Sequence, residues 1–209
     1  MAKNQSLFDA ICKGKRDAVG TILKDAIDKG EDVEAILMES MIPAMRDIGD
    51  RFSRNEVYVP EMLIAARAMK TGLDLIEPIL TKTGHQPVGR VAIGTVKGDL
   101  HDIGKNLVSI MLKGAGFEVD DLGVDCDAAK FAASVEKGTT VCCLSALLTT
   151  TMPYMKEIVD HFKGNGKVKV VIGGAPVTQA YANEIGAHGY ADNASDAVKA
   201  VERVLGIIA

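Results

Sequence analysis

The 209-residue sequence lacks several features that would assign it at once to a well-defined class of proteins. Its four cysteines form no Cys-x-x-Cys pair, so we expect neither a zinc site nor a disulfide framework. No run approaches 18 apolar residues, and the N-terminus lacks the apolar core of a signal peptide, so we expect a cytoplasmic protein. The net charge is −4 without any block of like charges, which argues against nucleic-acid and membrane partners.

Two common phosphate-binding loops are also missing. A P-loop needs four residues between its glycines and then Lys-Ser/Thr, whereas Gly98 and Gly104 bracket five residues and Asn106 follows Lys105. The dinucleotide fingerprint Gly-x-Gly-x-x-Gly does not occur. What the sequence does have is 47% hydrophobic residues, enough for a sizeable core, and 25% charged residues for a solvated surface.

Residues 1–85 are expected to form a small helical-bundle domain. Apolar residues recur at helical spacing in four segments with short connections, the pattern of a bundle. Pro43 should kink or locally break one of these helices, whereas Pro60 suits the first turn of the last helix. A polar stretch with Gly and Pro at 81–89 indicates a linker, in which His85 is expected to be solvated.

Residues 86–209 are expected to form a second domain of the α/β class. Short apolar runs that indicate strands lie at 90–96, 118–123, 139–146, 168–173 and 188–191. Helical patterns lie at 105–115, 127–137, 152–163, 178–186 and 195–206. Five strands alternating with helices predict a doubly wound parallel sheet, covered on both faces, with flavodoxin-like strand order.

The loop from Lys97 to Gly104 joins the first of these strands to its helix, at the edge of the sheet where ligands bind. Asp99 and His101 are two residues apart, so in an extended segment their side chains point the same way. The carboxylate can then hydrogen-bond one imidazole nitrogen and leave the other to bind a metal or move a proton. Gly98 and Gly104 would let a bulky group approach the backbone. The alternative is a surface loop with one solvated histidine.

Three segments in register carry a resemblance to a known family. They are Asp-Leu-His-Asp-Ile-Gly at 99–104, the Ser-Ala-Leu of Ser145 to Leu147, and Gly173-Gly174, and they follow the first, third and fourth expected strands. Together they resemble the cobalamin-binding modules of methionine synthase, of some mutases and of the small corrinoid proteins of methanogens and acetogens. Each segment alone is a weak signal, whereas three in order on the right elements form a specific one.

The resemblance implies roles for particular residues. It implies that cobalamin binds with its own base swung away, that His101 replaces this base as lower cobalt ligand, and that Asp99 orients the imidazole. Thr151 stands where methionine synthase has a serine hydroxyl that completes a triad, and Tyr58 stands where its helical cap puts an aromatic ring over the corrin. The residues so assigned to cofactor binding are Gly98, Asp99, His101, Asp102, Ile103, Gly104, Ser145, Leu147, Thr149, Gly173, Gly174 and Tyr58, and those assigned to catalysis are Asp99, His101 and Thr151.

The combination of a helical domain and a cobalamin domain without a substrate barrel resembles the corrinoid methyl carriers of methylamine, methanol, betaine or aryl-ether demethylation. This resemblance implies three partners: a substrate-specific methyltransferase, a second methyltransferase that uses tetrahydrofolate or a thiol, and a reductive activator. It also implies that the chain is not catalytic alone. The alternatives are a mutase small subunit, a cobalamin-binding sensor or regulatory module, and a flavodoxin-like domain without cobalamin. The methyl donor and acceptor stay open.

Overall fold

The computed structural model describes residues 4–208. Its contacts divide the chain into two compact units, one formed by residues 4–87 with 114–116, the other by 88–113 with 117–208. Across residues 4–208, no helix combines the length and the apolar character that crossing a membrane would require.

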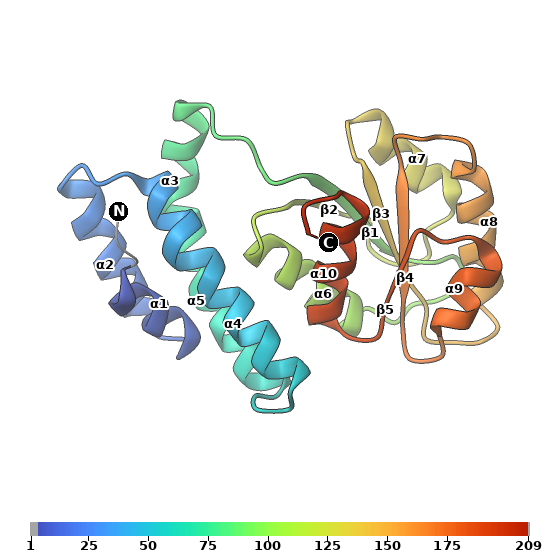
Figure 1. The fold of residues 1–209 in the computed structure, drawn as a ribbon, viewed down its shortest axis with the longest axis horizontal. Helices are drawn as coiled ribbons and strands as arrows, with labels where there is room; N and C mark the ends of the chain where they lie inside the picture. Colours follow the sequence, from blue (N-terminus) through green and yellow to red (C-terminus); the bar gives the residue numbers. More distant parts are fainter. Residues whose placement is uncertain (1–3, 209) are drawn as a thin grey trace. The chain divides into compact units, whose positions relative to one another are not determined.

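The first unit is a bundle of helices (Figure 1). Their bounds are α1 Gln5–Cys12, α2 Arg16–Asp28, α3 Val33–Ile36, a π-helical turn η1 Leu37–Met41, α4 Ile42–Ser53 and α5 Val59–Thr83. The first helix begins where the Asn4 side chain accepts the Leu7 N–H at 3.0 Å, and it is followed by Gly14 at a left-handed φ of 66°. The apolar stripes of these helices meet in a core that includes Leu7, Leu23, Met41, Met45 and Ile76.

Pro43 does not break its helix. Instead, the helix widens into the π turn η1 directly before α4, and it stays continuous from Val33 to Ser53. Proline has no N–H to donate and crowds the carbonyl four residues before it, and a wider turn accommodates both. Ile42 accordingly donates its N–H five residues back, to the Leu37 carbonyl.

The last helix of the bundle, α5, begins with Pro60 in its first turn, as expected. It ends at Thr83, and Gly84 follows it at a left-handed φ of 75°. The linker is therefore shorter than its composition indicated. The expectation of a solvated His85 is wrong, because its side chain is only 17% exposed and its Nδ1 lies 3.1 Å from Glu34 Oε1.

The second unit contains a five-stranded sheet in which every pairing is parallel. Its strands are β1 Arg90–Thr95, β2 Glu118–Asp121, β3 Val141–Ser145, β4 Lys169–Gly173 and β5 Gly189–Ala191, in the order β2-β1-β3-β4-β5. This is the flavodoxin-like arrangement, and it confirms the predicted fold class.

Helices cover both faces of this sheet. In Figure 1, α6 (Ile103–Gly114) and α10 (Ala194–Val204) lie on one side, and α7 (Ala128–Glu136), α8 (Met152–Phe162) and α9 (Gln179–Ile185) on the other. The central strands are buried on both faces, as parallel strands usually are. Cys142 and Cys143 are part of this interior as free thiols, and burial raises the pKa of Cys142 to about 12.

One boundary matters for the site. The helix expected at 105–115 begins at Ile103 instead, so that Ile103 and Gly104 belong to the first turn of α6. Lys105 in the same turn pairs through its Nζ with both carboxylate oxygens of Asp121 at the end of β2. The loop that carries Asp99 and His101 is therefore short and is fixed at both ends by regular structure.

Candidate functional site

The ends of three strands bring the separate sequence segments together. In the sheet register, Thr95 pairs with Ser145, and Ser145 pairs with Gly173. Because neighbouring parallel strands end at the same edge, the loops that follow these residues start side by side. The three segments singled out in the sequence thus meet at one edge of the second unit.

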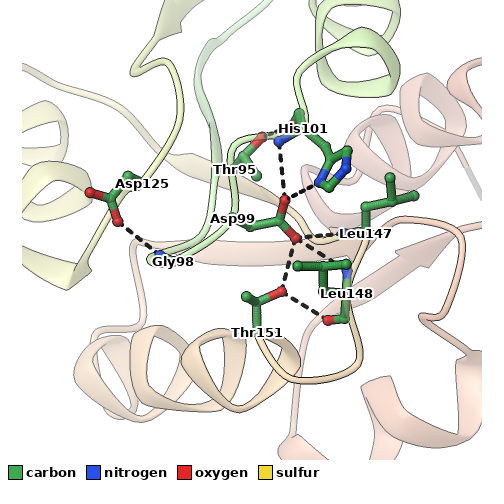
Figure 2. A network of polar contacts seen from close by, with 8 residues as sticks. All are labelled: Thr95, Gly98, Asp99, His101, Asp125, Leu147, Leu148 and Thr151. Atoms are coloured by element: carbon green, nitrogen blue, oxygen red, sulfur yellow. Dashed lines mark hydrogen bonds and ion pairs between the residues drawn. The ribbon is translucent and has the colours of Figure 1, made fainter.

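Asp99 and His101 are in direct contact at this edge (Figure 2). His101 Nδ1 lies 2.7 Å from Asp99 Oδ1, which also accepts the His101 backbone N–H at 3.1 Å. The Asp99 side chain is fully buried, whereas the imidazole is 52% exposed. No residue in 4–208 hydrogen-bonds Nε2 of this ring. A carboxylate therefore holds one nitrogen, and the other is accessible for a metal or a proton.

The second oxygen of Asp99 is held by the loop after β3 (Figure 2). Oδ2 accepts the N–H groups of Leu147 at 2.8 Å and Leu148 at 3.2 Å. The buried Thr151 hydroxyl lies 2.9 Å from Oδ2 and 2.8 Å from the Leu148 carbonyl oxygen, so its single proton serves one acceptor at a time. The triad of Asp99, His101 and Thr151 expected from the resemblance is thus present as a hydrogen-bonded group.

These contacts fix the charge of Asp99. Burial alone would raise the pKa of its carboxyl group. The hydrogen bonds from Leu147, His101 and Thr151 outweigh burial and hold this pKa well below its usual range. Asp99 is therefore an ionised acceptor at neutral pH, which keeps the imidazole oriented with Nδ1 toward the carboxylate.

Three residues that the sequence analysis did not single out hold the same loop. The Thr95 hydroxyl, at the end of β1, donates to the His101 carbonyl at 2.7 Å. The Gly98 N–H donates to Asp125 Oδ1 at 2.8 Å, and Leu148 contributes the N–H described above. The position of Thr95 at the end of an expected strand could have indicated its contact with this loop. No local pattern in the sequence indicates that Asp125 is a partner of the loop.

The loop after β3 offers polar and apolar groups to a ligand. Ser145 is half-buried, and its hydroxyl has no hydrogen-bond partner within residues 4–208. Thr149 is exposed, also without a side-chain partner in the described chain, and the Leu147 side chain is 43% exposed. Asp102, at the other side of the site, accepts a hydrogen bond from the Asn106 side chain at 3.0 Å.

The glycines at the site differ in what requires them. Gly98 has a φ of 78°, which favours glycine. A Cβ on Gly173 would lie 2.9 Å from the Ala191 carbonyl oxygen, and one on Gly174 would lie 1.9 Å from that of Ala146, so close backbone packing explains both. Gly104 has neither reason, because a Cβ there would meet open space.

The exposed surface around His101 fits a large, partly apolar cofactor such as the corrin expected from the sequence. Four apolar residues are exposed on the two loops and the first turn of α6, namely Leu100 (72%), Ile103 (81%), Leu147 (43%) and Leu148 (42%). A cluster of exposed apolar side chains indicates a binding surface. Among residues 4–208, no three His, Cys, Asp or Glu side chains are grouped so that they could hold a metal ion. His101 Nε2 offers a single ligand atom.

Two further features do not take part in this hydrogen-bond network. Tyr58 is the N-cap residue of α5 in the first unit, where its N–H donates to Glu61 Oε2, and the residue is 66% exposed. Its place over the upper face of a corrin stays a prediction. A cavity of about 170 Å³ lies beside Lys97 and the starts of α7 and α8, with Asp127 and Tyr154 in its lining. None of the site residues expected from the sequence lines this cavity.

The chain is similar to known proteins along almost its full length. Two family models, both described as B12 binding domains, match residues 4–77 and 89–199. Dimethylamine corrinoid protein 2 of Methanosarcina acetivorans is 41% identical over 210 residues, covering 97% of this chain and 96% of that protein. A corrinoid protein of Desulfitobacterium hafniense is 36% identical over 213 residues, 99% of each chain. The solved methanol:cobalamin methyltransferase complex of Methanosarcina barkeri matches with a TM-score of 0.85 and 29% identity, over 96% of this chain and 78% of the matched one.

Proposed function

The chain belongs to the family of corrinoid proteins, and from this premise we propose that it carries a methyl group on bound cobalamin between two methyltransferases. When bound, cobalamin supplies the cobalt centre that accepts and gives up the methyl group. The protein's own residues bind the cofactor, orient it and hold its ligand. The observation that carries this proposal is the Asp99–His101 pair, with Nε2 uncommitted beside four exposed apolar side chains.

The roles proposed for the residues follow from their contacts. His101 Nε2 would hold the cobalt when cobalamin is bound, and Asp99 fixes the imidazole through Nδ1. Thr151 and the N–H groups of Leu147 and Leu148 hold Asp99 in place. The hydroxyl of Ser145, at the end of β3 and without a partner among residues 4–208, would hold the nucleotide tail of the cofactor.

The proposed partners are a substrate-specific methyltransferase, a second methyltransferase that uses tetrahydrofolate or a thiol, and a reductive activator. The methanol:cobalamin methyltransferase complex of Methanosarcina barkeri, in which one chain resembles this one, supports the first of these. Relatives named for dimethylamine make methylamines the first donors to test, with methanol second. The chain alone is expected to turn over none of these donors.

The experiment is a transfer of isotope-labelled methyl groups. The cobalamin-loaded, reduced chain is incubated with labelled dimethylamine, monomethylamine or methanol, with and without the corresponding purified methyltransferase. We expect label to elute with the chain only when the methyltransferase is present, and to reach an acceptor only when a second enzyme is added. The carrier role would be contradicted, and a sensor favoured, if the chain binds cobalamin but takes up no labelled methyl group from any of these donors, from betaine or from aryl ethers. Multiple turnovers without a partner would also contradict it.

A further inference from the structure

Asp125 has an unusual backbone conformation in a loop that faces the site. It lies between β2 and α7, with a φ of 52°. Among the described residues, the only other non-glycine with positive φ is Asn55, in the first unit. A side chain in this left-handed region is disfavoured, although Asp and Asn tolerate it better than most residues. Such an outlier is a reason to look for a local role.

The contacts of Asp125 bracket one peptide of the loop that carries His101, and Figure 2 shows the contact to Gly98. Its Oδ1 accepts the Gly98 N–H at 2.8 Å, and its own N–H donates to the Asp99 carbonyl at 3.1 Å. Lys130 Nζ in turn holds the Asp125 carbonyl at 3.1 Å.

These contacts hold the loop on the side opposite to the other anchors. Leu147, Leu148 and Thr151 reach Asp99 from the β3 loop, whereas Asp125 reaches it from the β2 loop. Asp125 is exposed, so the hydrophobic core does not account for its position. Without the Asp125 carboxylate, the Gly98 N–H loses its partner, and Gly98 is the residue of this loop with the freest backbone.

We propose that Asp125 is a positioning residue for cobalt ligation: it fixes the Gly98–Asp99 peptide, and through Asp99 the direction in which the His101 imidazole presents Nε2. This inference rests on the proposed function, because it assumes that His101 binds cobalt. Within residues 4–208, Asp125 makes no hydrogen bond to the imidazole itself and acts on it only through the Gly98–Asp99 segment. Its effect is expected on how well His101 competes for the metal and less on whether cobalamin binds.

Three substitutions separate the hydrogen bond from the backbone conformation. Asp125→Asn keeps an acceptor oxygen and tolerates positive φ, so it should match the wild type. Asp125→Gly tolerates positive φ and removes the acceptor, and Asp125→Ala removes the acceptor and strains the backbone. Asn55→Gly makes the same kind of replacement at the other left-handed residue, in the first unit, and serves as the matched control.

The test uses the full chain loaded with Co(II) cobalamin and labelled with ¹⁵N-histidine. Nitrogen splitting in the electron paramagnetic resonance spectrum is a doublet when His101 is the axial ligand and a triplet when added ¹⁴N-imidazole replaces it. We expect the imidazole concentration for half-replacement to fall about three- to tenfold in Asp125→Gly, the equivalent of one hydrogen bond. Hydrogen exchange of the Gly98 amide in the cofactor-free chain should rise by a similar factor.

Half-replacement in Asp125→Gly at the wild-type concentration would overturn the inference, and so would equal losses in Asp125→Asn and Asp125→Gly, because Asn retains the acceptor. A similar loss in Asn55→Gly would point to a general effect on the chain and overturn it as well. A wild-type spectrum without the ¹⁵N doublet would instead refute the proposed function, which keeps the two failures distinct.

Discussion

The hydrogen bonds to Asp99 make its replacement the most informative perturbation of the site. Five donor contacts converge on its two oxygens, and the side chain is fully buried. Asp99→Ala leaves the N–H groups of Leu147, Leu148 and His101 without their acceptor. The Thr151 hydroxyl can still turn to the Leu148 carbonyl at 2.8 Å, and the half-exposed imidazole can turn to water.

The magnitude follows from these stranded groups. An unsatisfied, partly buried donor costs about 1 kcal/mol at the lower end of the usual range, so three of them lower the free energy of unfolding by about 3 kcal/mol. Asp99→Asn keeps one oxygen for the β3 loop and turns an amide NH₂ toward the His101 N–H. With one stranded donor and no charge, it should lose about 1–2 kcal/mol.

The contribution of Asp99 to the stability of the fold should decrease as the pH falls. The pKa of the Asp99 carboxyl is lower in the folded chain than the value of about 3.9 expected when unfolded. Its contribution to stability is therefore complete above about pH 5 and is lost progressively as the pH falls through 4 toward the folded-state pKa. The stability gap between the wild type and Asp99→Asn should narrow over that range, because Asn does not titrate.

Urea unfolding, followed by the amide NMR signals of β3, measures this gap within the second unit. We expect the order wild type, Asp99→Asn, Asp99→Ala at pH 7, and a smaller gap to Asp99→Asn at pH 3.5 than at pH 6. The reasoning fails if Asp99→Ala is as stable as the wild type at pH 7. It also fails if the gap to Asp99→Asn is the same at both pH values.

Three other predictions concern the residues proposed to bind cobalamin. Ser145→Ala should weaken cobalamin binding about three- to tenfold in equilibrium dialysis without changing the melting temperature, because its hydroxyl has no protein partner in the described chain; unchanged affinity would rule out its role. Gly104→Ala should leave the free energy of unfolding unchanged or higher and should weaken cobalamin binding. Gly174→Ala, with a Cβ 1.9 Å from a carbonyl oxygen, should lower the free energy of unfolding by more than about 3 kcal/mol. Equal effects of the two substitutions on stability would contradict the different reasons given for these glycines. Residues 86–209 alone should fold and bind cobalamin, since the Asp99 network lies there, and a folded fragment without binding would show the assignment to be wrong.

The fold was largely predictable because its signals are periodic. Apolar runs mark the parallel strands, and their alternation with helices leaves few arrangements of the sheet. The meeting of Ser145 and Gly173 with the loop after Thr95 follows from the rule that parallel strands end at one edge. Spacing alone also placed Asp99 beside His101, because residues two apart in an extended segment share a side.

What could not be predicted depends on contacts between distant loops. Nothing near Asp125 in the sequence indicates that its φ is positive or that its carboxylate reaches Gly98, 27 residues away. The π turn before Pro43 reflects how the surrounding bundle accommodates a proline that a helix interior would otherwise exclude. His85 was expected in solvent because its neighbours are polar, yet the fold brings Glu34 to it. These three features depend on contacts between residues far apart in the sequence, which local patterns do not predict.

The claim that His101 binds the cobalt of a base-off cobalamin is tested most directly by the axial nitrogen itself. The chain is prepared with ¹⁵N-histidine, loaded with unlabelled Co(II) cobalamin, and examined by electron paramagnetic resonance beside His101→Ala. The account predicts a nitrogen doublet in the wild type and its loss in His101→Ala. A triplet from the cofactor's own ¹⁴N base in both proteins would contradict it.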